Sequence, residues 1–258
     1  MKSGVHLYSL YELGKIIQKI LPYEYVVVGN YGCPLKSPNC EDIIELKDLL
    51  GEDRVLHYIS PKLPQGYVLP EFDKITKLLE KGIEITINDL GLFYLLKREC
   101  SDYGVYLGRM LTKTMWDSVW ATRLNKTEKE EVIDYFKQCN FNDDAKIEYF
   151  KENGVIGIEV NACAYSEKSL ERISQKGLSV IGYADSKILA VSRSCPIRRL
   201  NEARCSELCE RRLSLLPAGE NTLVYPSMEL HGNAIVQPEK NTYYWDGYTA
   251  IIHSFTDD

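Results

Sequence analysis

Short β-branched, apolar runs alternate with amphipathic stretches along most of the chain, and this alternation constrains the fold more than any other feature. The rhythm is typical of βαβ units, in which helices connect parallel strands. It predicts strands at residues 5–8, 25–29, 55–59, 83–87, 105–108, 155–160 and 178–183. It predicts helices at residues 9–20, 42–50, 72–81, 90–98, 126–138 and 169–176.

Seven predicted strands are close to the eight of a (β/α) barrel, and elements this short suit that fold or an incomplete version of it. Two glycines, Gly82 and Gly177, follow predicted helices directly, as C-terminal caps do. Thr127 stands before three glutamates, which predicts a helix start because the helix dipole favours acidic groups there.

The rhythm ends after Asp185, where the helical period is absent. Residues 222–226, 228–236 and 248–253 are predicted strands, separated by Pro, Gly and Asn. We therefore expect one α/β domain over residues 1–258. It comprises a (β/α) barrel-like body, a Cys-rich segment at 192–212 and a short β-rich C-terminal closure at 213–258.

Charge and hydropathy limit the classes of function. The net charge of -6 and the pI near 5.4 disfavour a broad nucleic-acid surface, although a local basic pocket stays open. No run approaches the roughly 18 apolar residues of a membrane span, and the first residues lack the sections of a signal peptide. We expect a cytoplasmic protein with no membrane contact. Its eight cysteines then point to metal or redox chemistry rather than disulfides.

Three cysteines lie within fifteen positions in the fragment CPIRRLNEARCSELC: Cys195, Cys205 and Cys209. Two cysteines separated by three residues place their sulfurs on one face of a helical turn, which suits an iron–sulfur cluster or a zinc site. The best fourth ligand is Cys33, directly beyond a predicted strand, with Cys40 as the alternative. Zinc and unrelated thiols remain alternatives to the cluster.

The fragments VVVGNYGC, NDLG (residues 88–91) and CPIRRLNEARCSELC together resemble the U-32 peptidase-like family, and within it the iron–sulfur UbiV-like branch. The resemblance implies a 4Fe–4S cluster as cofactor, held by Cys33, Cys195, Cys205 and Cys209. It also implies a component of oxygen-independent hydroxylation that acts on a small aromatic or heterocyclic substrate. Relatives work with a related partner protein, so a heterodimer is implied as well. The gap of nine residues between the first two late cysteines is shorter than in that branch.

Several charged residues are candidates for binding a substrate. Arg198 and Arg199 surround the cluster ligands, and Arg109 and Glu159 stand at predicted strand ends, where barrel active sites are built. Guanidinium groups there would bind an anionic group such as a carboxylate. The alternative for each is an ordinary solvated or structural charge.

Other reactive residue types are expected to be structural. Asp89 is predicted to cap a helix. The four histidines, His6, His57, His231 and His253, lie in strand-like runs and are expected to pack, as are Cys100, Cys139 and Cys163. No G-x-S-x-G, H-E-x-x-H or phosphate-binding glycine loop occurs, so the sequence gives no support to protease activity.

Three functional hypotheses remain. The first is a cluster-dependent hydroxylase component with a small-molecule substrate. The second is a non-catalytic redox or structural iron–sulfur subunit of a hetero-complex. The third is a natural-product tailoring or sulfur-transfer protein. No residue can be assigned as catalytic from the sequence.

Overall fold

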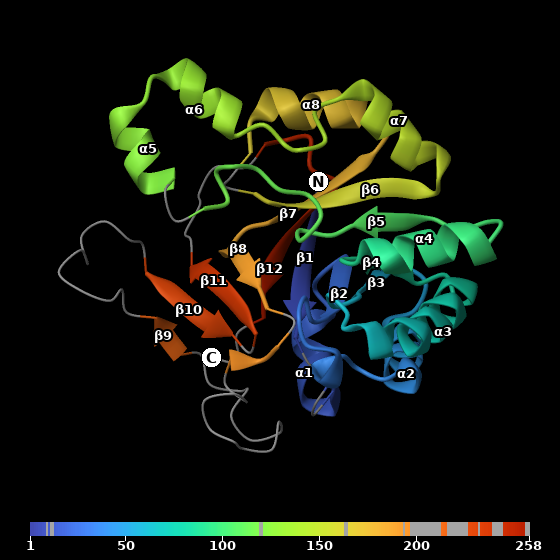
Figure 1. Cartoon of the computed structure of the whole chain (residues 1–258). Helices are drawn as coiled ribbons and strands as arrows, with labels where there is room; N and C mark the ends of the chain where they lie inside the picture. Colours follow the sequence, from blue (N-terminus) through green and yellow to red (C-terminus); the bar gives the residue numbers. More distant parts are fainter. Residues whose placement is uncertain are drawn as a thin grey trace.

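Eight parallel strands close into a barrel in the computed structural model, in the order β1-β12-β7-β6-β5-β4-β3-β2 (Figure 1). The structure describes residues 1–8, 10, 13–118, 121–162, 165–192, 194–196, 213–215, 227–231, 233–238 and 245–255. The barrel strands are β1 (Lys2–Leu7), β2 (Tyr25–Gly29), β3 (Val55–Ile59), β4 (Glu84–Ile87), β5 (Val105–Leu107), β6 (Val155–Asn161), β7 (Ser179–Tyr183) and β12 (Ala250–Ser254). The predicted (β/α) barrel is confirmed, and the barrel is complete.

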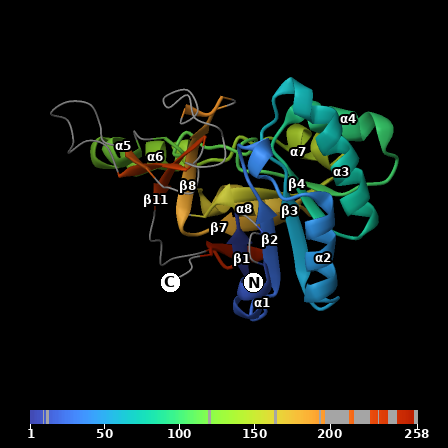
Figure 2. The same cartoon turned by 90° about the horizontal axis from the view of Figure 1, so that it is seen from below.

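Helices cover the outside of this barrel (Figures 1 and 2). They are α1 (Leu13–Ile20), α2 (Cys40–Leu50), α3 (Val68–Glu80), α4 (Leu90–Glu99), α5 (Ala121–Thr127), α6 (Glu130–Phe136), α7 (Asp144–Glu152) and α8 (Glu167–Gln175), with 3-10 turns η1 (Pro34–Lys36) and η2 (Gln65–Tyr67). Side-chain caps start three of them: Asn39, Asp89 and Asp143 each accept a hydrogen bond from a backbone N–H of the first turn. The capping role predicted for Asp89 is confirmed.

Most residues of the barrel strands are buried and apolar, because the strands lie between the helices outside and the barrel interior. All five residues of β2 are buried. One face packs against the helices in a large aliphatic cluster that includes Val26, Ile43 and Leu78. The other face turns into the barrel, where a smaller cluster is rich in tyrosine and includes Tyr25 and Tyr183.

A second sheet is inserted between β7 and β12. It is antiparallel, in the order β8-β11-β10-β9, with β8 (Ser186–Val191), β9 (Leu213–Leu215), β10 (Met228–His231) and β11 (Ala234–Pro238). It lies beside the barrel, away from α2 and α3 (Figure 2). β12 then returns and pairs in parallel with both β1 and β7, so the β-rich tail supplies the eighth strand.

Some sequence predictions were wrong. The predicted single helix at 126–138 is divided between two helices. Thr127 is the last residue of α5, and α6 begins at Glu130. The predicted strand at 228–236 is a hairpin of β10 and β11. The structure also contains α7, β8 and β9, which the sequence pattern does not predict, while the predicted strand at 222–226 lies outside the described residues. Gly82 and Gly177 come after α3 and α8, as predicted, and both have positive φ. No helix within the described ranges is long and apolar enough to cross a membrane.

Candidate functional site

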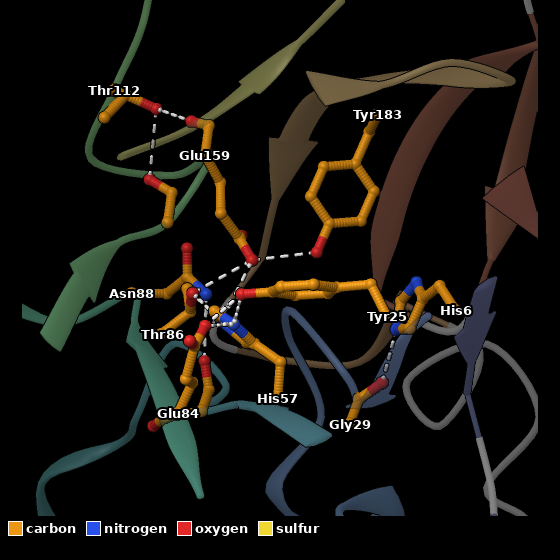
Figure 3. Close-up of polar contacts among 12 residues, drawn as sticks. His6, Tyr25, Gly29, His57, Glu84, Thr86, Asn88, Thr112, Glu159 and Tyr183 are labelled. Atoms are coloured by element: carbon orange, nitrogen blue, oxygen red, sulfur yellow. Dashed lines mark hydrogen bonds and ion pairs between the residues drawn. The ribbon is translucent and has the colours of Figure 1, made fainter. Parts of the chain in front are cut away.

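Polar side chains fill the middle of the barrel, where a (β/α) barrel is ordinarily packed with aliphatic groups (Figure 3). Alternate residues of a strand face opposite sides, so His57, Thr86 and Glu159 turn inward from β3, β4 and β6 while their neighbours face the helices. All three are fully buried. Buried polar groups are costly unless hydrogen-bonded, so their contacts decide what this arrangement can do.

His57 has polar partners on both ring nitrogens. Its Nδ1 lies 3.0 Å from Tyr25 Oη and 3.3 Å from Glu84 Oε2. Its Nε2 lies 2.5 Å from Thr86 Oγ1 and 3.5 Å from Glu159 Oε1. The ring therefore lies between two carboxylates, Glu84 toward the amino end of the barrel and Glu159 deeper inside.

Glu159 is held at one oxygen only. Its Oε1 accepts hydrogen bonds from Thr86 Oγ1 at 2.9 Å and from Tyr183 Oη at 2.8 Å. Its Oε2 is buried and has no hydrogen-bond partner within the described residues. A native carboxylate oxygen left in this way is rare and marks a place where a ligand group or water is to be expected.

Arg109 lies beside Glu159 at the carboxyl end of β5 and is fully buried. Its guanidinium carbon lies 3.9 Å from the ring centre of Tyr183 and 4.4 Å from that of Tyr31, so the cation is held between two aromatic faces. One guanidinium nitrogen donates to Asn161 Oδ1 at 3.0 Å and to the Ser186 carbonyl at 3.1 Å. Its Nε has no partner in the described part of the chain.

Burial and neighbouring groups together set the protonation states of Arg109 and Tyr183. Burial alone would lower the pKa of Arg109, but Tyr31, Tyr183 and Glu159 nearby raise it, so the cation persists. Burial, together with Glu159, raises the pKa of Tyr183 well above its usual value, although Arg109 opposes this shift. Tyr183 is therefore a neutral hydrogen-bond donor between a carboxylate and a cation.

The backbone around the site is fixed by close packing. Gly29 ends β2 with a φ of 123°, and a Cβ there would lie 2.4 Å from the Ile59 carbonyl oxygen, so only glycine suits this position. The same Gly29 carbonyl lies 3.0 Å from His6 Nε2. On the next strands, Asn88 joins two loops, since it donates to the Ser60 carbonyl and accepts from Met110 N–H.

The inserted sheet lies against the carboxyl ends of the barrel strands. Asn233, just before β11, donates from Nδ2 to the Gly32 carbonyl and, at 2.7 Å, to the Ser192 carbonyl. A Cβ on Gly32 would lie 2.6 Å from Val191 Cγ1, so these two segments are in direct contact. Gly32 precedes Cys33, and Ser192 lies three positions before Cys195.

Two of the four predicted cluster ligands therefore lie on adjoining segments. Cys33 and Cys195 are half-buried and form no disulfide. Cys205 and Cys209, like Arg198 and Arg199, lie outside the described residues, so the ligand set stays a prediction. Thiolates on converging loops are a donor set that suits iron–sulfur ligation. The part of the chain that the structure describes contains no group of three or more metal-binding side chains.

The other cysteines of the described ranges differ in setting, and Cys163 lies outside those ranges. Cys40 is the first residue of α2, and burial raises the pKa of its thiol. Cys139 is fully buried, and burial raises its pKa to about 12, which makes its thiol unreactive at neutral pH. Cys100 caps the end of α4, far along the chain from either ligand segment.

The sequence analysis named Arg109 and Glu159 but expected His57 only to pack. Arg109 and Glu159 both contact Tyr183. Glu159 also adjoins a polar group made of His57, Thr86 and Glu84 (Figure 3). The available signal was a histidine in the middle of a strand that is otherwise apolar, VLHYI, because such a strand has both faces buried.

Comparison with known proteins gave one kind of match. No family model matches the chain, and no curated protein matches it. Among solved structures, the chain is similar to the U32 peptidase Mk0906, with a TM-score of 0.48 and 12% sequence identity, over 100% of this chain and 94% of that chain. The assignment of a (β/α) barrel rests on the strand pairing described above.

Proposed function

We propose that this protein holds a 4Fe–4S cluster at the mouth of its barrel through Cys33, Cys195, Cys205 and Cys209. We further propose that it serves an oxygen-independent hydroxylation system acting on a small aromatic or heterocyclic anion. The observation that carries the proposal is the junction made by Asn233, which ties the turn before Cys33 to the segment before Cys195. These cysteines are far apart in the sequence, and the junction brings the segments that carry them into contact.

A cluster with four cysteine ligands leaves no iron open, so when bound it would supply electron transfer rather than substrate coordination. The chain's own residues supply the rest of the site. Arg109 is a buried cation, fixed between Tyr31 and Tyr183, and guanidinium groups pair with carboxylates in a planar, two-pronged geometry. This favours a carboxylate-bearing substrate next to the cluster.

The cluster is tested by purifying the protein without oxygen and measuring iron, acid-labile sulfide and visible absorbance together. We expect about four irons and four sulfides per chain, lost in Cys33→Ala and Cys205→Ala. Cys40→Ala and Cys100→Ala are the matched controls and should keep both elements. Zinc in place of iron, or unchanged iron in Cys33→Ala, would contradict the assignment.

The substrate class is tested separately by thermal unfolding in the presence of benzoate and of uncharged benzamide. Benzoate should raise the unfolding temperature of the wild type, and benzamide should not. Arg109→Met should abolish the shift, and Arg109→Lys should reduce it, because a lysine cannot form the two-pronged contact. An equal shift with both compounds would argue against a carboxylate site.

A further inference from the structure

A continuous line of polar groups runs from the amino end of the barrel into its interior (Figure 3). It begins at Glu84, the first residue of β4, whose side chain is 31% exposed at the amino end of the barrel. It passes through His57 and Thr86 and ends at Glu159, which is 0% exposed. Solvent therefore reaches one end of the line and not the other.

Each step in the line is within reach of a hydrogen bond. Glu84 Oε2 lies 3.3 Å from His57 Nδ1, and Tyr25 Oη contacts both groups. His57 Nε2 lies 2.5 Å from Thr86 Oγ1, and Thr86 Oγ1 lies 2.9 Å from Glu159 Oε1. Imidazole and hydroxyl groups can each donate and accept, which is what passing a proton along a line requires.

We propose that Glu84, His57 and Thr86 form a proton path that carries protons from solvent at the amino end of the barrel to Glu159. A proton enters at the Glu84 carboxylate and moves to His57 Nδ1. The proton on Nε2 moves to Thr86 Oγ1, and the hydroxyl proton of Thr86 moves to Glu159 Oε1. Only N–H and O–H bonds form and break, and nothing is oxidised or reduced. Rotation of the Thr86 hydroxyl and exchange of the imidazole tautomer reset the path.

The end of the path explains the unpartnered oxygen of Glu159. Once Oε1 carries the proton, a half-turn of the carboxyl group about its Cγ–Cδ bond brings the O–H into the position of Oε2, from which the proton can pass to a group bound beside Arg109. That use of the proton rests on the proposed function, whereas the path itself does not. The groups that face His57 are Glu84, Glu159, Thr86 and the rings of Tyr25 and Tyr106.

The Glu84 carboxylate, at the entrance of the path, is held in its ionised form by its neighbours. Burial alone would raise the pKa of Glu84, but hydrogen bonds and charge attraction from His57, with hydrogen bonds from Tyr25 and Tyr106, lower it below its usual value. An ionised carboxylate at a partly exposed position accepts a proton from water and passes it on without trapping it.

The path is tested by following the protonation of Glu159 after a rapid drop in pH, with time-resolved infrared spectroscopy on substrate-free protein purified without oxygen. The carboxyl band of Glu159 is identified by its loss in Glu159→Gln. Thr86→Val has almost the same shape as wild type but no hydroxyl, and Glu84→Gln removes the entrance. Both should slow protonation by about 100-fold or more.

Two controls separate a proton path from general damage to the fold. Thr86→Ser keeps the hydroxyl and should protonate Glu159 at the wild-type rate, as should His253→Gln, which lies off the path. Wild-type rates in Thr86→Val and Glu84→Gln would overturn the proposal, and so would a Glu159 band that never changes with pH. If Thr86→Val fails to fold, the partly exposed Glu84→Gln variant decides the question.

This result does not depend on the cluster assay. If the protein binds no iron but the variants slow protonation of Glu159, the path is supported and the proposed function is contradicted. If the protein binds four irons but the variants protonate Glu159 at the wild-type rate, the cluster is supported and the path is contradicted.

Discussion

The outer layer of the barrel and its interior are built from the same strands but differ in composition. Between strands and helices the buried residues are mostly aliphatic, and helices α3 and α4 supply Ile75 and Leu96 among them. Inside, the smaller cluster mixes four tyrosines with aliphatic residues and lies beside the buried polar groups of His57 and Glu159. Aliphatic burial supplies most of the folding free energy, while a buried polar network supplies little net stability. The interior is therefore where this barrel carries its chemistry.

The largest expected effect lies in the outer layer. Ile75→Ala, in α3, removes a fully buried side chain and should lower the free energy of unfolding by about 2–5 kcal/mol. Urea denaturation measures this loss. Leu69→Ala, on the same helix but 64% exposed, is the control and should change the free energy by less than about 0.5 kcal/mol. Equal losses in both variants would remove the distinction between core and surface on this helix.

The junction between barrel and inserted sheet should come next. Gly32→Ala places a Cβ 2.4 Å from Asn233 Oδ1 and 2.6 Å from Val191 Cγ1, so the sheet must shift. We expect a loss of about 1–3 kcal/mol, together with reduced iron content in protein purified without oxygen. Gly66→Ala, where nothing lies within 4 Å of the new Cβ, should leave both unchanged. Full iron content in Gly32→Ala would show that cluster binding does not depend on this junction.

A single interior hydrogen bond should matter less for stability. Tyr183→Phe removes the hydroxyl that donates to Glu159 Oε1 and should cost about 1 kcal/mol, measured by urea denaturation. Tyr135→Phe, on exposed α6, is the matched control and should have no effect. A loss as large as that of Ile75→Ala would show that polar contacts in the interior stabilise the fold as much as aliphatic burial does.

The smallest expected effect is a pH dependence of the stability contributed by an ion pair near the carboxyl end of β12. His253 Nδ1 lies 3.1 Å from Asp185 Oδ1, and this hydrogen bond raises the pKa of His253 although burial opposes it. A raised histidine pKa adds stability below the unfolded value of about 6.5, and that stability is lost as pH rises through the folded pKa. Burial alone would raise the pKa of Asp185, but hydrogen bonds from His253 and the Ser254 N–H lower it. The stability that Asp185 contributes is therefore lost as pH falls into the acid range.

Asp185→Asn should therefore cost most stability in mildly acidic solution and less in alkaline solution. Both side chains are 41% exposed, so solvent screening keeps the difference below about 1 kcal/mol. Thermal unfolding of wild type and variant across pH 5–9 measures it. A difference that grows toward alkaline pH would contradict the direction of the His253 shift.

The sequence by itself determined seven of the eight barrel strands, because each is largely a local apolar run. The eighth, β12, was predicted as a strand of the C-terminal closure. β2 and β3 have the predicted bounds, and Asp89 caps α4 as its position before an apolar run implied. Local signals failed where two short elements adjoin, as at α5 and α6, since neighbouring helices share one amphipathic pattern.

Only the tertiary structure decided how distant segments meet. Thr86 and Glu159 are 73 positions apart in the chain, and Asn233 and Gly32 are 201 apart, yet both pairs form hydrogen bonds. Closure of the barrel brings them together, because it aligns inward-facing residues of strands that are remote in sequence. A sequence pattern reports which face of a strand is apolar, but partners across a closed barrel follow from the register of eight strands, which no local pattern contains.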